Sequence, residues 1–402
     1  MSATSPVSVV HIITQLELGG AQQNTLFTIS HLDSTRFRSV LITGEPGLLD
    51  EEAKALPGID FYQIPTLRRS IRPIADGHAL FKLTKLLARI KPAIVHTHSS
   101  KAGIVGRFAA RMAHVPIIVH SIHGFGFTPA QYPLLRRILI AIERRAGRIT
   151  SRFFAVSEAN RRTGISLGIF PAERCSVIRS GVDLRALRRT DVNVAGKKRQ
   201  LGLDSDRPTI GMVAPFKPQK APLDFVHLAA VVHRQSPSAQ FVMIGDGDMR
   251  PAVKQEIDRH GLASSMHLLG WRRDIPEILR CLNVLVLTSR WEGLPRVYLE
   301  ALASGVPVVG TRVDGAPEVI RDGINGYLLE PGDVAGLADR VLYLLTHPAD
   351  ATRMGRNAQS VPPEFDIHEM VRRQEREYER LIVEWQHTIV RHDRWPSTTV
   401  PI

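Results

Sequence analysis

The chain has 402 residues, of which 44% are apolar and 23% are charged. This length is sufficient for two domains with cores of their own, and the composition is that of a globular protein rather than a disordered or fibrous one. No apolar run approaches the roughly 18 residues that a membrane-spanning helix requires. The cysteines, Cys175 and Cys281, are two in number and far apart, which argues against a disulfide framework.

Positive charge is concentrated in the first half of the chain. The net charge is +13, yet residues 1–200 hold 29 Lys and Arg against 13 Asp and Glu, whereas residues 201–402 hold 23 against 26. A one-sided positive field favours an anionic partner: nucleic acid, an anionic membrane face or a phosphorylated substrate. A solvated basic surface is the alternative. Residues 1–6 lack the basic and apolar parts of a signal peptide, so we expect a cytoplasmic protein.

The first half alternates predicted strands and helices, beginning with a strand at residues 7–13. This alternation is typical of a doubly wound α/β domain, in which ligands bind at the carboxyl ends of the strands. Gly19 and Gly20 follow the first strand. They do not form a G-x-G-x-x-G pattern and so give no support for dinucleotide binding, but two glycines allow a backbone to approach a ligand closely.

Histidines mark the ends of two further predicted strands. His96 and His98 close one strand, and His123 follows the next, directly before Gly124. A His-x-His pair on a strand places both rings on one face, but no carboxylate or cysteine nearby in sequence completes a metal site. We therefore expect no bound metal. His123 is a candidate for a polar contact in a substrate cleft, and a hydrogen-bonded histidine without a functional role is the alternative.

A helix predicted at residues 134–145 combines an apolar run with the arginine pairs Arg136-Arg137 and Arg144-Arg145. Its basic edge suits anionic lipid head groups, with the apolar stripe inserted in the membrane. An ordinary amphipathic core helix is the alternative. The basic, polar stretch that follows at residues 185–207 is typical of an exposed linker between domains.

The second half starts a new α/β alternation with a strand at residues 209–213. The loop after it carries Lys217 and Lys220, which suit a diphosphate, although two solvated lysines would give the same pattern. A last helix is predicted from residue 365 to 385, with Met370 and Tyr378 near one face.

A buried strand at residues 284–287 leads into Glu292-Gly293-Leu294-Pro295 and then a helix, with Gly305 just past its end. The free N–H groups and positive dipole end of such a helix suit a phosphate. A carboxylate beside that phosphate would repel it. Glu292 and Glu300 are therefore better suited to hydroxyl groups on either side of the phosphate, as in a nucleotide sugar.

Taken in order, these segments resemble the retaining GT-B glycosyltransferases of glycosyltransferase family 4. The matching segments are Gly19-Gly20-Ala21, residues 95–98, His123-Gly124, Val156-Ser157, Gly181-Val182-Asp183, Gly245-Asp246-Gly247, residues 292–295 with Glu300-Ala301, and residues 315–318. The resemblance covers roughly residues 7–385. It departs at Pro215, where the family has arginine and Lys217 is the substitute, and at Ser180, where the family has asparagine.

The resemblance implies an α/β fold of the GT-B class, with two doubly wound Rossmann-like domains facing across a cleft. We expect an acceptor-binding domain at residues 1–190, a linker at 191–207 and a donor-binding domain at 208–363. A C-terminal helix at 364–385 that can cross back to the first domain and a tail at 386–402 complete the expected organisation.

The resemblance also implies roles for individual residues. Glu292, Lys220 and His123 would be catalytic: Glu292 contacts sugar hydroxyls, Lys220 neutralises the diphosphate, and His123 lines the reaction centre. Donor binding would involve Glu300, Gly293, Leu294, Arg296, Lys217, Gly270, Arg272 and Gly245, while Gly19, Gly20 and His98 would line the acceptor cleft.

The expected reaction is metal-independent, cofactor-free and retaining. A nucleotide-diphosphate sugar is the expected donor, and the expected acceptor is a lipid-linked or phosphorylated glycan in cell-surface polysaccharide biosynthesis. We also expect peripheral contact with anionic lipid at the inner face of the plasma membrane, and no nucleic acid. One alternative is a basic nucleic-acid-binding protein, against which stand an aromatic content of 6% and the lack of a nucleic-acid module pattern. The other is a nucleotide-sugar epimerase or sugar phosphorylase on a related scaffold.

Overall fold

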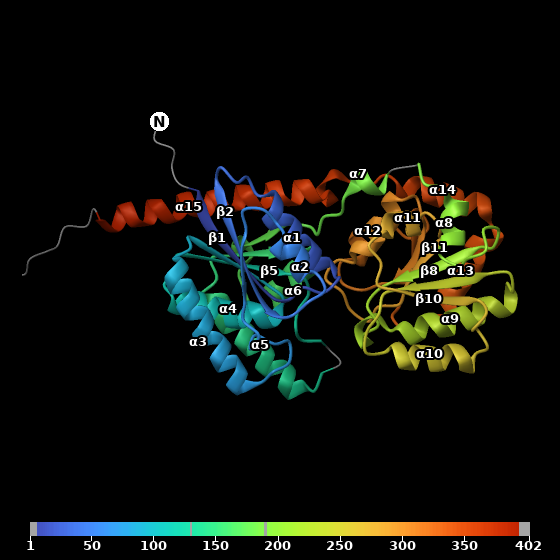
Figure 1. The fold of residues 1–402 in the computed structure, drawn as a ribbon, viewed down its shortest axis with the longest axis horizontal. Helices are drawn as coiled ribbons and strands as arrows, with labels where there is room; N and C mark the ends of the chain where they lie inside the picture. The colour runs from blue at the N-terminus through green and yellow to red at the C-terminus, as the bar shows by residue number, and fades with distance from the viewer. Residues whose placement is uncertain (1–5, 129–130, 189–190, 394–402) are drawn as a thin grey trace, which may run out of the picture. The chain divides into compact units, whose positions relative to one another are not determined.

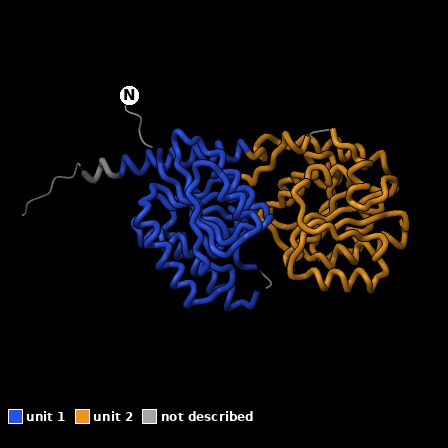
Figure 2. The backbone as a smooth tube through the Cα atoms, in the orientation of Figure 1, with its two compact units in different colours: residues 1–156, 160–178, 368–402 blue, residues 157–159, 179–367 orange. Residues whose placement is uncertain are grey.

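The computed structural model describes residues 6–128, 131–188 and 191–393. These form two compact units (Figure 2). Unit 1 comprises Met1–Val156, Asn160–Ile178 and His368–Ile402, and unit 2 comprises Ser157–Ala159 and Arg179–Ile367. Among the described residues, no helix combines the length and the apolar character that crossing a membrane would require.

Unit 1 is built on a parallel sheet of seven strands in the order β3-β2-β1-β4-β5-β6-β7. Strands β1, β2 and β5 of this sheet are labelled in Figure 1. The strands are β1 (Val7–Gln15), β2 (Phe37–Glu45), β3 (Asp60–Gln63), β4 (Ile94–His98), β5 (Ile117–Ile122), β6 (Arg152–Ala155) and β7 (Cys175–Val177). The helices are α1 (Gly20–His31), α2 (Asp50–Lys54), α3 (Pro73–Ile90), α4 (Ser100–Met112), α5 (Pro133–Arg148), α6 (Glu158–Ser166), η1 (Ala172–Arg174) and α15 (Ile367–Asp393).

Alternation along β1 divides the core of unit 1 between the two faces of its sheet. Val10 and Ile12 point into an apolar cluster with α3 and α4, which includes Leu83 and Ala109. His11 and Ile13 point to the opposite face, where Ile13 packs with residues of α1 and α2. Tyr378 of α15 is fully buried and also reaches this second face, where it contacts a histidine of β4.

Unit 2 is built on a parallel sheet of six strands in the order β10-β9-β8-β11-β12-β13. The strands are β8 (Thr209–Val213), β9 (Gln240–Ile244), β10 (Met266–Gly270), β11 (Val284–Leu287), β12 (Val308–Thr311) and β13 (Gly326–Leu329). The helices are α7 (Leu184–Leu187), α8 (Val194–Gln200), η2 (Pro218–Lys220), α9 (Pro222–Gln235), α10 (Arg250–Arg259), α11 (Ile275–Leu279), α12 (Arg296–Ala303), η3 (Ala316–Glu318), α13 (Val334–Thr346), α14 (Pro348–Ala358) and η4 (Pro363–Phe365).

The boundary between the units differs from the one expected from the sequence. The division falls at Ile178, not near residue 190, and residues 191–207 are not an exposed linker. They contain α8, in which Lys197 is buried and forms ion pairs with Asp274 and Glu277. The basic composition of this stretch was misleading because these carboxylates, distant in sequence, neutralise Lys197.

The C-terminal helix α15 is longer than the expected range of 364–385. It runs from Ile367 to Asp393, so part of the expected tail is helical, and residues 394–402 lie outside the described residues. No glycine or proline occurs between residues 367 and 395, and the first proline after the helix start is Pro396, so nothing in the sequence interrupts the helix earlier.

Candidate active site

Each sheet has one point at which the strand order reverses, and ligands of doubly wound folds bind at the carboxyl ends of the strands there. In unit 2 the reversal lies between β8 and β11, and in unit 1 between β1 and β4. Lys220 lies in the loop after β8, and the loop after β11 leads to α12. The Gly19-Gly20 pair follows β1, and His98 is the last residue of β4. Some of the sequence-predicted site residues therefore lie at the switch point of each unit, whereas Gly245, Gly270 and His123 lie at the ends of neighbouring strands.

The central contact in unit 2 is an ion pair between Lys220 and Glu292. The ammonium group of Lys220 donates to Oε1 of Glu292, and the two side chains are only 16% and 7% exposed. Ser289 donates from Oγ to the same carboxylate oxygen at 2.6 Å. Because little water reaches this pair, its electrostatic interactions are stronger than those of exposed charges. The structure thus brings together two of the three residues expected to be catalytic.

The two loops that carry this pair are joined by hydrogen bonds. The hydroxyl of Thr288 donates to the carbonyls of Lys220 and Ala221 at 3.0 and 2.9 Å. Gln219 donates to the carbonyl of Trp291 at 2.9 Å, and the N–H of Arg290 donates back to Gln219 at 2.8 Å. The separation of the ammonium and carboxylate groups is therefore fixed by a rigid connection between the ends of β8 and β11.

The start of α12 lies directly after Glu292-Gly293-Leu294. Pro295 occupies the N-cap position, so no side chain caps the first turn. Arg296, the first helical residue, pairs with Glu300 one turn later at 3.3 Å. Burial lowers the pKa of the Arg296 guanidinium, while the Glu300 charge raises it. Arg296 and Glu300, both expected to bind donor, thus form a second ion pair beside the N–H groups of the helix start.

Two residues of unit 2 complete this site but were not singled out from the sequence. Oδ2 of Asp314 accepts a hydrogen bond from the backbone N–H of Glu292 at 2.7 Å. The backbone of Asp314 has a positive φ of 38°. Thr311 donates to the carbonyl of Ser289 at 2.6 Å. Both lie at or just after the end of β12, 22 residues beyond the residue that each contacts, so no local spacing pattern could have connected them.

Gly245 and Gly270, both expected to bind the donor, have a structural role that the structure makes visible. The N–H of Gly245 donates to the carbonyl of Gly270 at 2.8 Å, which joins the ends of β9 and β10. A Cβ atom at Gly245, where φ is 128°, would lie 2.0 Å from the carbonyl oxygen of Ala214. Only glycine therefore allows the β9 end to pack against the loop that carries Lys217 and Lys220.

Arg272 follows Gly270 and is held in place by a carboxylate. Its Nε and Nη2 donate to the two oxygens of Asp274 at 2.8 and 2.6 Å, in a bidentate pair. These contacts, together with Lys197 at 2.5 Å, hold the pKa of Asp274 at about 2. Arg272 is thus oriented at the carboxyl edge of the unit 2 sheet, where it was expected.

In unit 1, Gly19 is the N-cap of α1 and Gly20 is its first residue. A Cβ atom at Gly19 would lie 2.6 Å from the amide oxygen of Gln22. The helix begins without a side-chain cap at the carboxyl end of β1. A side chain at Gly19 would thus collide with Gln22, and the approach of this loop to a ligand stays a prediction.

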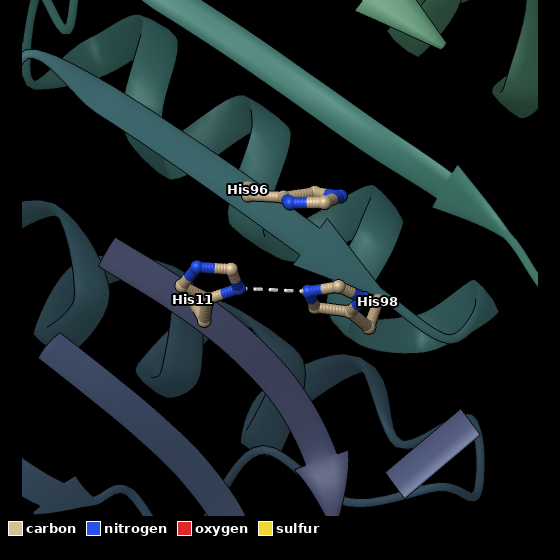
Figure 3. Close-up of side chains that lie close together, drawn as sticks. All are labelled: His11, His96 and His98. Carbon is tan, nitrogen blue, oxygen red and sulfur yellow. Dashed lines mark hydrogen bonds between the residues drawn. The ribbon is translucent and has the colours of Figure 1, made fainter. Parts of the chain in front are cut away.

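His98 and His123 lie together in unit 1. Nδ1 of His98 and Nε2 of His123 are 3.3 Å apart, and Nε2 of His98 is 3.0 Å from Nδ1 of His11 (Figure 3). His98 is buried and His123 is half-buried. His11 is a member of this group that the sequence alone did not indicate, because it lies 87 residues from His98 in the chain.

The group of His11, His96 and His98 has one feature of a metal site, since one ligand nitrogen of each lies within 4.8 Å of the others. His96 is however engaged on both nitrogens, with Tyr378 at Nδ1 and with Ser121 at Nε2 at 2.7 Å. The 3.0 Å contact between His11 and His98 is itself a hydrogen-bond distance. These three histidines are therefore held by hydrogen bonds, His11 and His98 by each other and His96 by Tyr378 and Ser121.

Comparisons with known proteins identify the family of this chain. The family described as "Glycosyltransferase Family 4" matches residues 18–186, and the family "Glycosyl transferases group 1" matches residues 194–361. A galactosyltransferase of Escherichia coli, named UDP-Gal:alpha-D-GlcNAc-diphosphoundecaprenol alpha-1,3-galactosyltransferase, is 34% identical over 344 residues, which are 83% of this chain and 86% of that protein. The putative glycosyltransferase EpsF of Bacillus subtilis is 28% identical over 76% of this chain and 79% of its own.

Solved structures show the same fold. The Anabaena protein HepE in complex with UDP and glucose superposes with a TM-score of 0.78 at 21% identity, covering 93% of this chain and 99% of its own. Sucrose-phosphate synthase of Thermosynechococcus elongatus has a TM-score of 0.81 at 19% identity, covering 94% and 100%. With two doubly wound units, matches to the family along both of them and a relative above 30% identity, the chain belongs to glycosyltransferase family 4 and is a GT-B glycosyltransferase.

Proposed function

We propose that the chain transfers a sugar from a nucleotide-diphosphate sugar to a lipid-linked glycan, with retention of configuration and without a bound metal or cofactor. The observation that carries this proposal is the dehydrated Lys220–Glu292 pair at the switch point of unit 2, directly before α12. Lys220 supplies positive charge where a diphosphate leaves, and the free N–H groups of α12 supply further donors. Glu292, anchored by Ser289, accepts from sugar hydroxyls.

This set of residues suits a retaining reaction. Cleavage of the sugar–phosphate bond builds negative charge on the departing diphosphate, and groups fixed in advance to stabilise that charge lower the barrier. The leaving phosphate can itself take the proton of the acceptor hydroxyl, so the reaction needs no protein base. In this proposal the negative charge is balanced by Lys220 and the helix start, and no step depends on a metal ion.

The relatives favour UDP as the nucleotide and a polyprenyl diphosphate as the anchor of the acceptor. The Escherichia coli relative is named for UDP-Gal and for a diphosphoundecaprenol acceptor. A Campylobacter jejuni relative, 24% identical over 324 residues, is also named for a diphospho-undecaprenol acceptor. We infer that this chain acts in the same kind of pathway, the assembly of cell-surface polysaccharide on a lipid carrier, with unit 2 binding the donor and unit 1 the acceptor.

A membrane-bound acceptor requires a surface that meets lipid, and we assign this role to the starts of α3 and α5. Ile74 is 81% exposed and Leu134 is 70% exposed, and these helices flank α4 on one face of the sheet. The apolar side chains exposed there are Ile71, Ile74, Tyr132, Leu134, Leu135 and Ile138. Arg69, Arg72 and Arg137 are exposed among them. Helices that follow parallel strands begin at the carboxyl edge of the sheet, so this surface borders the edge that carries His98.

The structure also decides how the α5 helix is oriented. Its buried residues are Ile140, Glu143, Ala146 and Gly147, whereas Leu134, Leu135 and Ile138 point outward. The apolar side chains of Leu134, Leu135 and Ile138 therefore lie outside the core, whereas Ile140 belongs to it. Exposed apolar groups next to arginines are the combination that binds the interface of an anionic bilayer. This supports peripheral membrane contact at the cytoplasmic face.

The role of Lys220 can be tested by binding. Lys220→Met should weaken UDP binding about 10- to 100-fold while changing uridine binding little, since the lost contact is to a charged phosphate. Lys254→Met, which alters an exposed lysine of α10, is the matched control. Calorimetry or thermal shift with UDP, GDP and ADP also identifies the base. Equal losses for UDP and uridine would show that Lys220 does not contact the diphosphate.

The role of Glu292 can be tested by turnover. Glu292→Gln keeps the size of the side chain and should lower kcat at least about 100-fold while UDP binding stays within a few-fold. The assay is transfer from a UDP-sugar to a short-chain prenyl-diphosphate sugar, and the anomeric coupling in the NMR spectrum of the product reports retention. Near-normal turnover of this variant, or an inverted product, would refute the proposed mechanism.

The membrane surface is tested with vesicles. Wild-type protein should sediment with vesicles that contain phosphatidylglycerol and not with phosphatidylcholine alone, and added salt should reduce the bound fraction. Leu134→Ser combined with Ile138→Ser should abolish binding, whereas Ile324→Ser, at an exposed apolar site of unit 2, should not. Salt-independent binding, or equal binding by both variants, would exclude this surface.

A further inference from the structure

Strand register places five polar side chains on one face of the unit 1 sheet. Successive residues of a strand point to opposite faces, so His96 and His98 share a face. His11 on β1 pairs directly with His96 on β4, and Ser121 on β5 pairs with His98. His123 lies two residues beyond Ser121. The fold therefore collects His11, His96, His98, Ser121 and His123 on the face that also receives α15.

Three of these histidines form a line of hydrogen bonds that leads from the core to the edge of the sheet. His11 and His98 have ring centroids 5.3 Å apart and ring planes only 10° apart, with their nearest nitrogens at 3.0 Å. The rings thus meet edge to edge, each pointing a nitrogen at the other (Figure 3). His98 repeats this contact with His123, at 3.3 Å between nitrogens and 5.6 Å between centroids.

The buried members of this line are uncharged at neutral pH. Burial lowers the pKa of His11 to about 3. Burial also lowers the pKa of His98 well below its ordinary value, and the neighbouring His96, His11, His123 and His120 lower it further. The groups that face His98 are these four histidines, and Tyr378 faces His96 from α15. A neutral imidazole has one donor nitrogen and one acceptor nitrogen, so each hydrogen bond fixes the direction of the next.

The inner end of the line sets this direction. Nε2 of His11 is buried and has no hydrogen-bond partner among the described residues. Most buried side-chain N–H groups have an acceptor, so the hydrogen of His11 belongs on Nδ1, where it donates to His98. His98 then carries its hydrogen on Nδ1 and donates to Nε2 of His123. His123 in turn must carry its own hydrogen on Nδ1.

The backbone next to His98 is also held in an unusual state. Ser99 has φ of 62° and ψ of 154°, a conformation that is populated almost only by glycine. Its hydroxyl lies 2.7 Å from that of Thr14 on β1. Strain of this kind persists only where surrounding contacts determine it, and it clusters at functional sites. The strained turn fixes the end of β4, and therefore the position of the His98 ring.

From this geometry we propose that His98, backed by His11, is a positioning residue that fixes His123 as the Nδ1–H tautomer. His123 then meets the substrate as a hydrogen-bond donor and not as a base, because its Nε2 lone pair is already occupied by His98. A proton passed inward along this line would end at His11, whose Nε2 has no acceptor among the described residues. This inference rests on the proposed role of His123 in the transfer reaction, and it explains why that reaction needs another proton acceptor, the leaving phosphate.

The first test reads the tautomer directly and requires no activity. Two-bond ¹⁵N–¹H NMR spectra of wild-type protein labelled at histidine distinguish imidazoles with hydrogen on Nδ1 from those with hydrogen on Nε2. We expect His98 to be a neutral Nδ1–H tautomer throughout pH 6 to 8, and neutral His123 to carry its hydrogen on Nδ1 as well. Hydrogen on Nε2 of His123, or protonation of His98 within this range, would overturn the proposal. This spectrum stands whether or not His123→Ala impairs sugar transfer, which tests the proposed function separately.

The second test uses a matched pair of variants. His98→Asn retains an amide N–H near the position of Nδ1, whereas His98→Leu has nearly the same volume and no donor. We expect His98→Leu to lower kcat about 10- to 100-fold with little change in KM for the donor, the loss expected when a catalytic group is misplaced. His98→Asn should restore most of this loss. Equal activity of the two variants would reject the positioning role.

Discussion

Because unit 1 contains buried histidines, we predict that it becomes less stable when the pH is lowered from 7 to 5. Burial lowers the pKa values of His11, His96, His98 and His120 far below the ordinary value of 6.5. Between these lowered values and 6.5, the unfolded chain binds protons that the native protein does not. The free energy of unfolding therefore rises with pH in this interval. The stabilising contribution of the neutral histidines is fully present above about pH 6.5 and is lost as the solution is acidified.

The size of the effect follows from the pKa difference. At pH 5, an unfolded histidine with a pKa of about 6.5 gains about 2 kcal/mol from protonation that the native state does not share. The four histidines together give about 8 kcal/mol, which is comparable with the entire stability of a typical domain, about 5 to 15 kcal/mol. Carboxylates held at a pKa of about 2, such as Glu369, lose their contribution only below about pH 4.5 and so fall outside this interval.

One buried cysteine in each unit supplies the assay. Cys175 lies in β7 of unit 1, and Cys281 lies in unit 2. After equilibration in urea at pH 5, 6, 7 and 8, a brief pulse of thiol reagent at pH 8 labels only unfolded units, and mass spectrometry locates the label. The urea midpoint reported by Cys175 should fall steeply from pH 7 to pH 5. The midpoint reported by Cys281 should fall less. Among the described residues of unit 2, burial lowers the pKa of a single histidine, His267.

Variants test whether the cluster is responsible. In the Cys175 assay, His11→Asn should lower the slope of the unfolding free energy against pH by about 1.4 kcal/mol per pH unit, which corresponds to one proton. His78→Asn, at an exposed site on α3, should leave this slope unchanged. A Cys175 midpoint that is constant between pH 7 and pH 5 would refute the conclusion that the cluster is neutral. The same holds if His11→Asn retains the full wild-type slope.

Three further outcomes are expected. Gly310→Ala should lower the free energy of unfolding reported by Cys281 by about 1 to 3 kcal/mol, because its Cβ would lie 1.9 Å from the hydroxyl of Tyr298. An unchanged Cys281 midpoint would contradict this packing. Tyr378→Phe should cost about 1 to 3 kcal/mol in the Cys175 assay by leaving His96 without its partner, and a loss seen only at Cys281 would contradict the contact. Removal of divalent metal with EDTA should leave sugar transfer unchanged, and activity that requires added Mg²⁺ would disprove metal independence.

The strand ends that carry function could be predicted from the sequence because their signals are local. Glu292, Gly293 and Leu294 follow a continuous apolar run, and such a run before a glycine–proline turn and a helix has few interpretations. The same holds for His98 and His123, each at the end of a strand. A parallel sheet brings consecutive strand ends to one edge, so knowledge of the strands was sufficient to group these residues at the right edge.

What the sequence could not supply depends on register and on partners distant in the chain. His11 joins the histidine cluster only because β1 pairs with β4 so that His11 faces His96, and a slip of one residue would place it on the other face. The unit boundary was misplaced for a similar reason. Arg179 forms ion pairs with Glu318 and Glu364, which draws residues after Ile178 into unit 2, although the stretch has the composition of a linker.

The two units use opposite electrostatics, and the reaction gives a reason. In unit 2 the site residues are charged, with Lys220 beside Glu292 in little water. In unit 1 the polar line consists of buried imidazoles that burial keeps neutral, although the first half of the chain holds the excess of positive charge. A fixed positive charge that binds substrate and transition state equally does not accelerate the chemical step. In the proposed reaction, charge placed at Lys220 acts where negative charge develops, whereas neutral donors orient the sugar without retaining the anionic product. A protonated His98 would remove this distinction, and the strong burial of the histidine line is what prevents its protonation.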